Sequence, residues 1–207
     1  MSPTLMRFSS LYISVLNVAN TRSKSVELRL SKKRFKCASL SAMITAVMTA
    51  SLIAHASEQI LPGFRPSEAQ RLRFWGFEIY DARLFAQPEF SVPQYASHNF
   101  GLELTYLRRV DGKDIAKRSI EEMKRIGKFN AAQEAEWLKA MTSIFPSVDR
   151  GDKLLGVYKP NEGAEFWVNQ KRLGAISDQQ FAKLFFGIWL HEATSAPEIR
   201  QAWIKKP

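Results

Sequence analysis

The sequence predicts an α+β fold, in which an antiparallel sheet packs against helices stacked on one of its faces. Strand-like and helix-like segments occur in separate blocks, in the order strands, two helices, strands, two helices. Segregated blocks of this kind are typical of α+β proteins rather than of alternating βαβ folds. The glycine-rich signatures of nucleotide-binding βαβ units, G-x-G-x-x-G and the P-loop, do not occur in the 207 residues.

The first block of strands lies between residues 72 and 108. Residues 72–85 are rich in aromatic and β-branched side chains, which predicts one long strand or a hairpin arm, with Gly76 at a bulge or a close approach. Residues 87–99 contain two prolines and are expected to form a connecting loop. Apolar residues then occupy the even positions from Phe100 onward, so residues 100–108 are expected to form a strand with one buried face.

Two helices are predicted after this block. A turn precedes apolar residues at helical spacing over residues 115–126, and Gly127 ends the pattern. Asn130 followed by Gln133 is a capping-box pattern, which predicts a second helix that ends at Phe145.

The second half of the chain again has strands first and helices afterwards. Three short strands with hairpin connections form a predicted meander over residues 154–158, 165–168 and 172–176. Ser177 is the expected N-cap of a helix over residues 181–190, which is apolar nearly all round and therefore buried on more than one side. A last short helix is expected from Pro197.

Most of the positive charge lies at the N-terminus. The chain has a formal net charge of +10, and residues 1–56 hold eight cations and one anion, against 22 cations and 19 anions in residues 57–207. A domain this close to neutrality lacks the electrostatic footprint of a nucleic-acid-binding protein, so no nucleic-acid partner is expected.

The N-terminal segment has the pattern of an export signal. A basic cluster at residues 32–36 precedes 18 uncharged residues, and an A-x-A sequence then ends at Ala56. We therefore expect residues 1–56 to comprise an extension plus a signal peptide, with an apolar region over about 37–54 and cleavage after about Ala56. Residues 57–207 would be one domain in the periplasm or outside the cell. The alternative is an uncleaved inner-membrane anchor formed by residues 37–56.

Residues that carry catalytic or metal chemistry are sparse in the predicted domain. The single cysteine, Cys37, lies in the leader, so disulfide and thiolate chemistry are not expected. His98 and His191 have no ligand partner at i+3 or i+4, so neither a metal nor another cofactor is expected. Glu121 and Glu122 point in different directions from one helix, and we expect a solvated face rather than an acid–base pair. No catalytic residue is assigned.

Aromatic residues and clustered arginines are the more distinctive features. An aromatic-lined cleft with one or two buried cations suits a small amphipathic anion, such as a fatty acid or a phenolic compound. The alternative is that the aromatic residues form the core and the arginines are solvated. The residues concerned are Trp75, Trp137, Trp167, Trp189 and Trp203, with Arg71, Arg73, Arg108 and Arg109.

Several segments together resemble the bacterial chalcone isomerase-like family. The most specific is the Phe-Phe-Gly-Ile-Trp-Leu sequence at residues 185–190. The resemblance covers nearly all of residues 70–200 and implies an open-faced β-sandwich, in which a curved antiparallel sheet packs against a helical layer with a ligand cleft between them. The other resembling segments are residues 71–85, 102–108, 115–123, 144–148 and 151–158.

The resemblance also implies a comparison with the plant isomerases of this fold, which cyclise a chalcone to a flavanone. Their polar threonine, tyrosine, asparagine and late-helix residue correspond here to Trp75, Ile115, Glu122 and Ile188. These replacements remove the hydrogen-bond donors that stabilise the transition state. The plant arginine, which holds the phenolate, has two possible counterparts, so Arg71 and Arg73 are the candidate ligand-binding residues.

We therefore expect an exported chalcone isomerase-like protein that binds a small amphipathic or aromatic ligand, a fatty acid or a phenolic compound, without catalysis. Membrane contact is expected only through the leader during export. One alternative is an isomerase, an intramolecular lyase of the chalcone–flavanone type with a different residue set. The other alternative is an envelope protein-interaction module, which would have a filled cleft and an exposed apolar patch.

Overall fold

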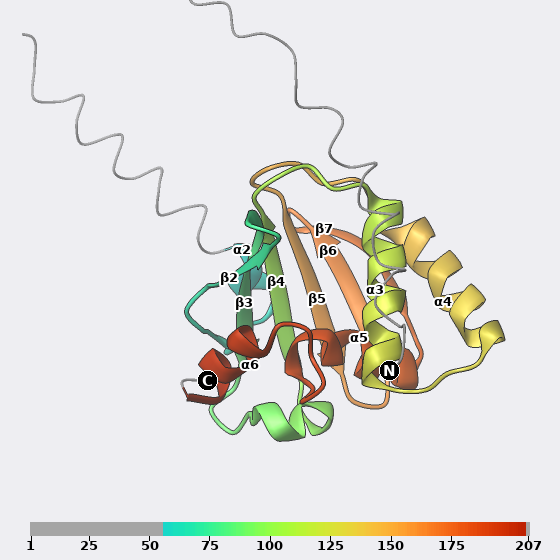
Figure 1. The fold of residues 1–207 in the computed structure, drawn as a ribbon. Coiled ribbons are helices and arrows are strands. Elements are labelled where there is room, and N and C mark those ends of the chain that lie inside the picture. Colours follow the sequence, from blue (N-terminus) through green and yellow to red (C-terminus); the bar gives the residue numbers. More distant parts are fainter. Residues whose placement is uncertain (1–55, 206–207) are drawn as a thin grey trace, which may run out of the picture. The chain divides into compact units, whose positions relative to one another are not determined.

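The computed structural model describes residues 56–205, which form one antiparallel sheet with most of its helices on one face (Figure 1). The predicted blocks are confirmed, because the first strands precede two helices and a three-strand meander precedes two more. The predicted signal peptide lies outside the described residues, apart from its last residue, Ala56.

The sheet has seven strands in the described part of the chain, in the order β1-β3-β4-β5-β6-β7, and β2 pairs with β3 beside β1. Both β1 and β2 lie along the same edge of β3, because β2 pairs with its first half and β1 with its last two residues. The strands are β1 (Arg65–Pro66), β2 (Gln70–Phe74), β3 (Phe77–Ala86), β4 (Phe100–Tyr106), β5 (Lys153–Lys159), β6 (Gly163–Val168) and β7 (Lys171–Ile176).

The segment expected as one long strand or a hairpin arm is a hairpin of β2 and β3. Its turn consists of Trp75 and Gly76, with φ angles of 51° and 79°. Two positive φ angles are the signature of the tight turns that match the twist of paired strands. Gly76 is therefore a turn residue, and the prediction of a bulge at that position is wrong. The register shift falls instead between Leu72 and Arg73.

The helices are α2 (Ala56–Ile60), α3 (Gly112–Ile126), α4 (Ala131–Ile144), α5 (Gln179–Leu190) and α6 (Pro197–Lys205), with a 3-10 helix, η2 (Val92–Ser97), in the predicted loop. The capping box of Asn130 and Gln133 is confirmed at the start of α4. The predicted cap of α5 is wrong by one residue, because Asp178 and not Ser177 accepts the hydrogen bond from the Phe181 amide. The other carboxylate oxygen of Asp178 accepts from Trp137 Nε1 at 2.9 Å, which ties α4 to α5.

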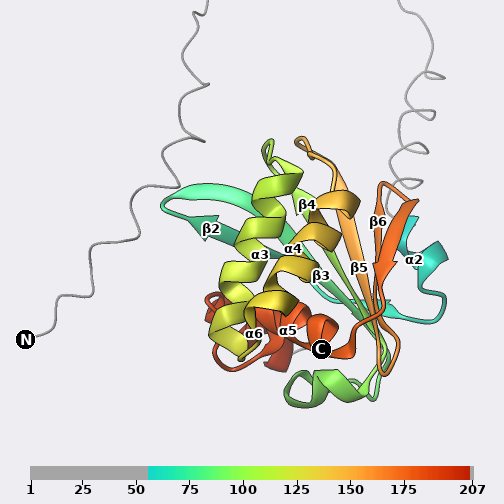
Figure 2. The same cartoon turned by 90° about the vertical axis from the view of Figure 1, so that its right-hand side faces the viewer.

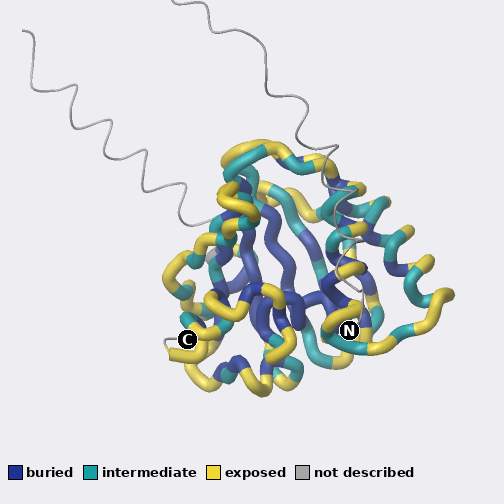
Figure 3. Tube along the Cα trace, viewed as in Figure 1, coloured by how far each residue is buried: buried dark blue, intermediate teal, exposed yellow. Residues whose placement is uncertain are grey.

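Helices α3 to α6 lie on one side of the sheet and α2 on the other (Figure 2). The main core fills the space between the sheet and the larger helical layer, where the strands are buried along their middle portions (Figure 3). Helix α5 has nine buried residues, as expected for a helix covered on more than one side.

The opposite face of the sheet is covered in part by α2 and the residues that follow it. Leu61 packs there with Phe85, Leu155 and Val157 in a second apolar cluster. For this reason β4 is buried on both faces, and the prediction of one buried face is wrong. The residues that follow Ala56 cover the face of β4 that was expected, from the alternation of polar and apolar residues in β4, to be exposed to solvent.

Candidate functional site

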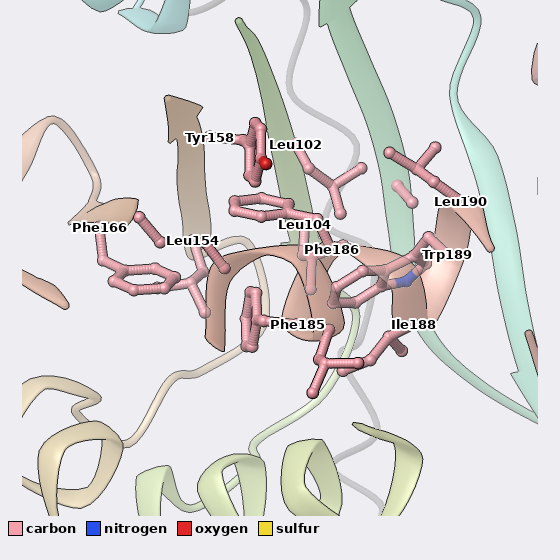
Figure 4. Close-up of a cluster of buried hydrophobic side chains, with 14 of the residues drawn as sticks. Leu102, Leu104, Leu154, Tyr158, Phe166, Phe185, Phe186, Ile188, Trp189 and Leu190 are labelled. Atoms are coloured by element: carbon pink, nitrogen blue, oxygen red, sulfur yellow. The ribbon is translucent and has the colours of Figure 1, made fainter. Parts of the chain in front are cut away.

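The space between the sheet and α5 is filled by aromatic and aliphatic side chains (Figure 4). Phe185 of α5 lies with its ring centroid 5.3 Å from those of both Phe166 and Phe186. Gly156 permits this packing, since a Cβ there would lie 3.1 Å from Cζ of Phe186. The remaining cavity measures about 10 Å³, which is room for roughly one water molecule. Ligand pockets usually measure roughly 300–1,000 Å³, so a bound ligand would have to displace side chains of α5.

Three polar groups border this apolar interior. Trp189 of α5 lines the small cavity and donates its Nε1–H to the hydroxyl of Tyr80 on β3 at 2.9 Å. Tyr106 on β4 is the cross-strand partner of Tyr80, and their ring centroids are 5.8 Å apart. Burial raises the pKa of the Tyr106 hydroxyl well above its usual value. The phenol is therefore protonated at neutral pH and available as a hydrogen-bond donor.

Arg118 of α3 connects the helical layer with the β2–β3 hairpin. Its guanidinium carbon lies 5.6 Å from the ring centroid of Phe74, which is on β2, and its nitrogens form ion pairs with Glu121 and Glu122. Phe74 is two residues from Leu72, which pairs with Tyr80. Since alternate residues of a strand share a face, Phe74 and Arg118 lie toward the same end of the interface as the tyrosines.

Glu122 is buried, with 5% of its surface exposed, so the expectation that both glutamates lie on a solvated face is wrong for this residue. A buried carboxylate is stable only when its charge is compensated. Two arginines one turn away on α3 compensate it: Arg118 makes a close ion pair and Arg125 lies at 3.6 Å. Helical spacing made this pairing possible, because residues three and four apart are neighbours on a helix.

The two arginines predicted to bind a ligand lie on β2, on the sheet face turned away from Tyr80. Arg71 donates two hydrogen bonds to Asp81, at 2.7 and 2.9 Å, and pairs with Glu78 at 2.9 Å. Arg73 also pairs with Glu78. These arginines hold the pKa values of Asp81 and Glu78 below their usual range, chiefly through the hydrogen bonds from Arg71. Ligand binding by the arginines stays a prediction, and the structure gives both of them carboxylate partners.

The four positions compared with the plant isomerases are not brought together as a polar site. Trp75 lies in the hairpin turn and is 86% exposed. Ile115 and Ile188 supply no hydrogen-bond donor from their side chains, and Glu122 is held by arginines. In the described residues, Trp189 lines the cavity and donates to the Tyr80 hydroxyl, and the ring of Tyr106 packs beside that of Tyr80.

Other parts of residues 56–205 contain weaker candidates for a functional site. They contain no group of three or more potential metal ligands among histidine, cysteine and carboxylate side chains. A hollow of about 480 Å³ lies beside the start of α3, but its lining mixes both signs of charge, with Asp111, Asp114, Lys113 and Lys117. No helix in this described range is long and apolar enough to span a bilayer.

Residues 69–203 match the family model described as chalcone isomerase-like, and the chain belongs to this family. Among solved structures, it is similar to the crystal structure of a fatty-acid binding protein from Arabidopsis thaliana, with a TM-score of 0.54 and 11% sequence identity. The match covers 69% of this chain and 87% of the plant protein. At this identity the likeness shows a common fold, the curved sheet packed against helices that the sequence predicted. A search of curated proteins finds no match.

Sequence reasoning did not single out the two tyrosines that border the interior. Tyr80 and Tyr106 occupy apolar-face positions of β3 and β4, where a tyrosine is read as core. The available signal was their pairing, because two phenols at facing positions of adjacent strands place two hydroxyls in one layer.

Proposed function

We propose that this protein binds a small amphipathic molecule, a fatty acid or a phenolic acid, between its sheet and α5 without catalysis. The observation that carries the proposal is the pair of buried phenols, Tyr80 and Tyr106, beside Trp189 at the border of an otherwise apolar interior. Polar groups at one end of an apolar volume match a molecule with one polar head. The fatty-acid binding protein with the same fold supports this class of ligand.

The ligand head would accept a hydrogen bond from the Tyr106 hydroxyl, next to Tyr80 and Trp189. A tyrosine hydroxyl is protonated at neutral pH, and burial raises the pKa of Tyr106 further, so this hydroxyl can donate to a carboxylate. Arg118 lies toward the same end of the interface and adds a positive charge near an anionic head. The ion pair with Glu122 partly neutralises this positive charge. The proposed ligands therefore include molecules with a neutral head group, such as alcohols, at weaker affinity.

The apolar tail would replace the aromatic rings that fill the interior. Phe185, Phe186 and Trp189 share one helix and all line the small cavity. Rotation of these rings, or a small shift of α5, would exchange one set of apolar contacts for another. The free energy gained from the buried tail, about 0.8 kcal/mol per CH₂ group, would offset the lost packing.

The proposal excludes catalysis because the polarising donors of the plant enzymes are replaced by Ile115 and Ile188. Two phenols can border a head group, whereas the side chains of Ile115 and Ile188 supply no polar group that would act on another atom of the ligand. Turnover of a chalcone to a flavanone by the purified chain would overturn this part of the proposal.

The proposal places residues 57–207 in the periplasm or outside the cell after cleavage near Ala56. The basic cluster, the uncharged stretch and the A-x-A sequence support it. Mass spectrometry of the chain isolated from its host tests the point, since a mass that includes residues 37–56 would favour the anchored form.

Native mass spectrometry of the protein from its host, followed by denaturing extraction, tests ligand binding directly. A co-purified fatty or aromatic acid is expected, and delipidated protein should bind it again in a titration. Tyr106→Phe should weaken binding roughly fivefold, the value of one hydrogen bond. Tyr158→Phe is the matched control, because that hydroxyl already donates to the Ala96 carbonyl. Wild-type protein that co-purifies with nothing and binds no fatty or phenolic acid would refute the proposal.

Arg73→Ala is a second test, which asks whether the arginine predicted from the family resemblance takes part. Because Arg73 faces away from the tyrosines and pairs with Glu78, we expect unchanged affinity for an interior ligand. A clear loss of affinity would indicate that the ligand binds at the edge of the hairpin instead of in the interior.

A further inference from the structure

We propose that the tip of the β2–β3 hairpin, residues 74–77, docks on the surface of a bilayer that contains anionic lipids. This contact is distinct from the interior ligand site, and it replaces the sequence-based expectation that only the leader contacts a membrane. It rests on the exposure of the tip, the conformation of its turn and the charges around it.

The tip exposes aromatic surface that the fold does not need. Trp75 is 86% exposed and Phe77 is 48% exposed, and of the other large apolar side chains in the described residues only Ile204 is comparably exposed. Trp75 also has a φ of 51°, in the left-handed region that a bulky residue rarely adopts. Asparagine or glycine is the usual residue at this place in such a turn. A tryptophan that is both exposed and unfavourable for its backbone has no evident role in folding, which points to a role outside the protein.

The tip is flanked by cations. Arg73 precedes it with a 63% exposed side chain, and the guanidinium carbon of Arg108 lies 5.4 Å from the ring centroid of Phe77. Within residues 56–205, Arg108 has no ion-pair partner. Residues 71–79 and 107–110 together hold four cations and one anion. Two of these cations, Arg71 and Arg109, pair with Asp81 and Asp149 just outside the ranges. The uncompensated positive charge at the tip is therefore that of Arg108, beside Phe77.

This combination fits the interface of an anionic bilayer. Tryptophan side chains concentrate at the level of the lipid head groups, where their amphipathic rings are stable. Arginines beside them attract the negative potential of anionic lipids. The hairpin reaches out past α3 (Figure 2), so its tip can enter a flat surface without a complementary groove. A protein partner would instead need a pocket shaped to hold Trp75. One outcome of the experiment below distinguishes a protein partner from a bilayer.

The test uses the chain as its host processes it, with vesicles of phosphatidylcholine alone or with an anionic phospholipid added. Trp75→Asn removes the aromatic ring and places a favoured residue in the turn, so the variant should fold at least as well as the wild type. Ile204→Asn is the control for an exposed apolar side chain elsewhere. Every variant is expressed with the same leader and processed in the same host, so differences in binding among the variants report the tip.

We expect anionic vesicles to bind the wild type at least about tenfold more tightly than Trp75→Asn, as burial of part of one indole predicts. Lipids brominated on their acyl chains should quench the emission that the wild type has and Trp75→Asn lacks. Arg108→Gln should reduce the preference for anionic over neutral vesicles. Equal binding and equal quenching in wild type and Trp75→Asn would overturn the proposal. Capture of a protein through Trp75, with no lipid binding, would also overturn it.

Discussion

Trp189→Ala tests whether the aromatic interior is the main source of stability in this fold. Trp189 is 5% exposed and donates to Tyr80 from α5. Truncation of a buried tryptophan costs about 3–5 kcal/mol in free energy of unfolding. The Tyr80 hydroxyl loses its donor as well, at a cost of about 1 kcal/mol. Trp189→Phe keeps most of the ring contacts and loses the hydrogen bond, so it should cost roughly 1–2 kcal/mol.

Urea denaturation followed by far-ultraviolet circular dichroism measures these changes, provided that the slope against urea stays constant. Trp75→Asn is the control, because it changes a tryptophan that is 86% exposed and should not destabilise the fold. The space left by Trp189→Ala adjoins the cavity of about 10 Å³, so the variant should also bind benzene or indole. A loss of stability below about 1 kcal/mol would refute the placement of this side chain in the core.

Three further changes test other parts of the structure. Asn130→Ala removes the capping box of α4 and should lower the free energy of unfolding by about 1 kcal/mol in a urea titration. Arg118→Gln leaves the buried Glu122 with a weaker partner and should destabilise by about 1–3 kcal/mol, and the double variant with Glu122→Gln should recover most of this loss. Because the pKa values of Asp81 and Glu78 are lowered in the fold, their contribution is complete above about pH 4.3 and is lost as the pH falls further. The protection factors of the hairpin amides, in which the intrinsic pH dependence of hydrogen exchange is divided out, should fall over that acidic range. Protection factors that stay constant would contradict the assignment.

The order and type of the main elements could be predicted from the sequence because local signals are strong there. The capping box at Asn130 and the meander over β5 to β7 depend on residues close together in the chain. The errors have a common origin in contacts between distant residues. Gly101 and Glu103 lie at positions that the alternating pattern assigns to solvent, yet Leu61 covers Gly101 and Ser57 covers Glu103, each from at least 40 positions away in the chain.

The candidate site was harder to predict than the fold. Aromatic content correctly indicated an apolar interior, but it could not show that side chains fill the interior almost completely. Arginine was expected at the site because of its charge, whereas Arg71 is compensated by Asp81 across the hairpin. Cross-strand register decides such pairing, and it is set by the two-residue turn at Trp75 together with the register shift between Leu72 and Arg73. Without that shift, Tyr80 would lie opposite Arg71.

The hairpin turn also relates the interior site to the exposed tip. Phe74 lies beside Arg118 at the border of the helical layer, while the adjacent Trp75 points into solvent. A tight turn at this point is what allows neighbouring residues to lie beside α3 and in solvent. A contact at Trp75 would therefore act one residue away from the side chain that packs on Arg118.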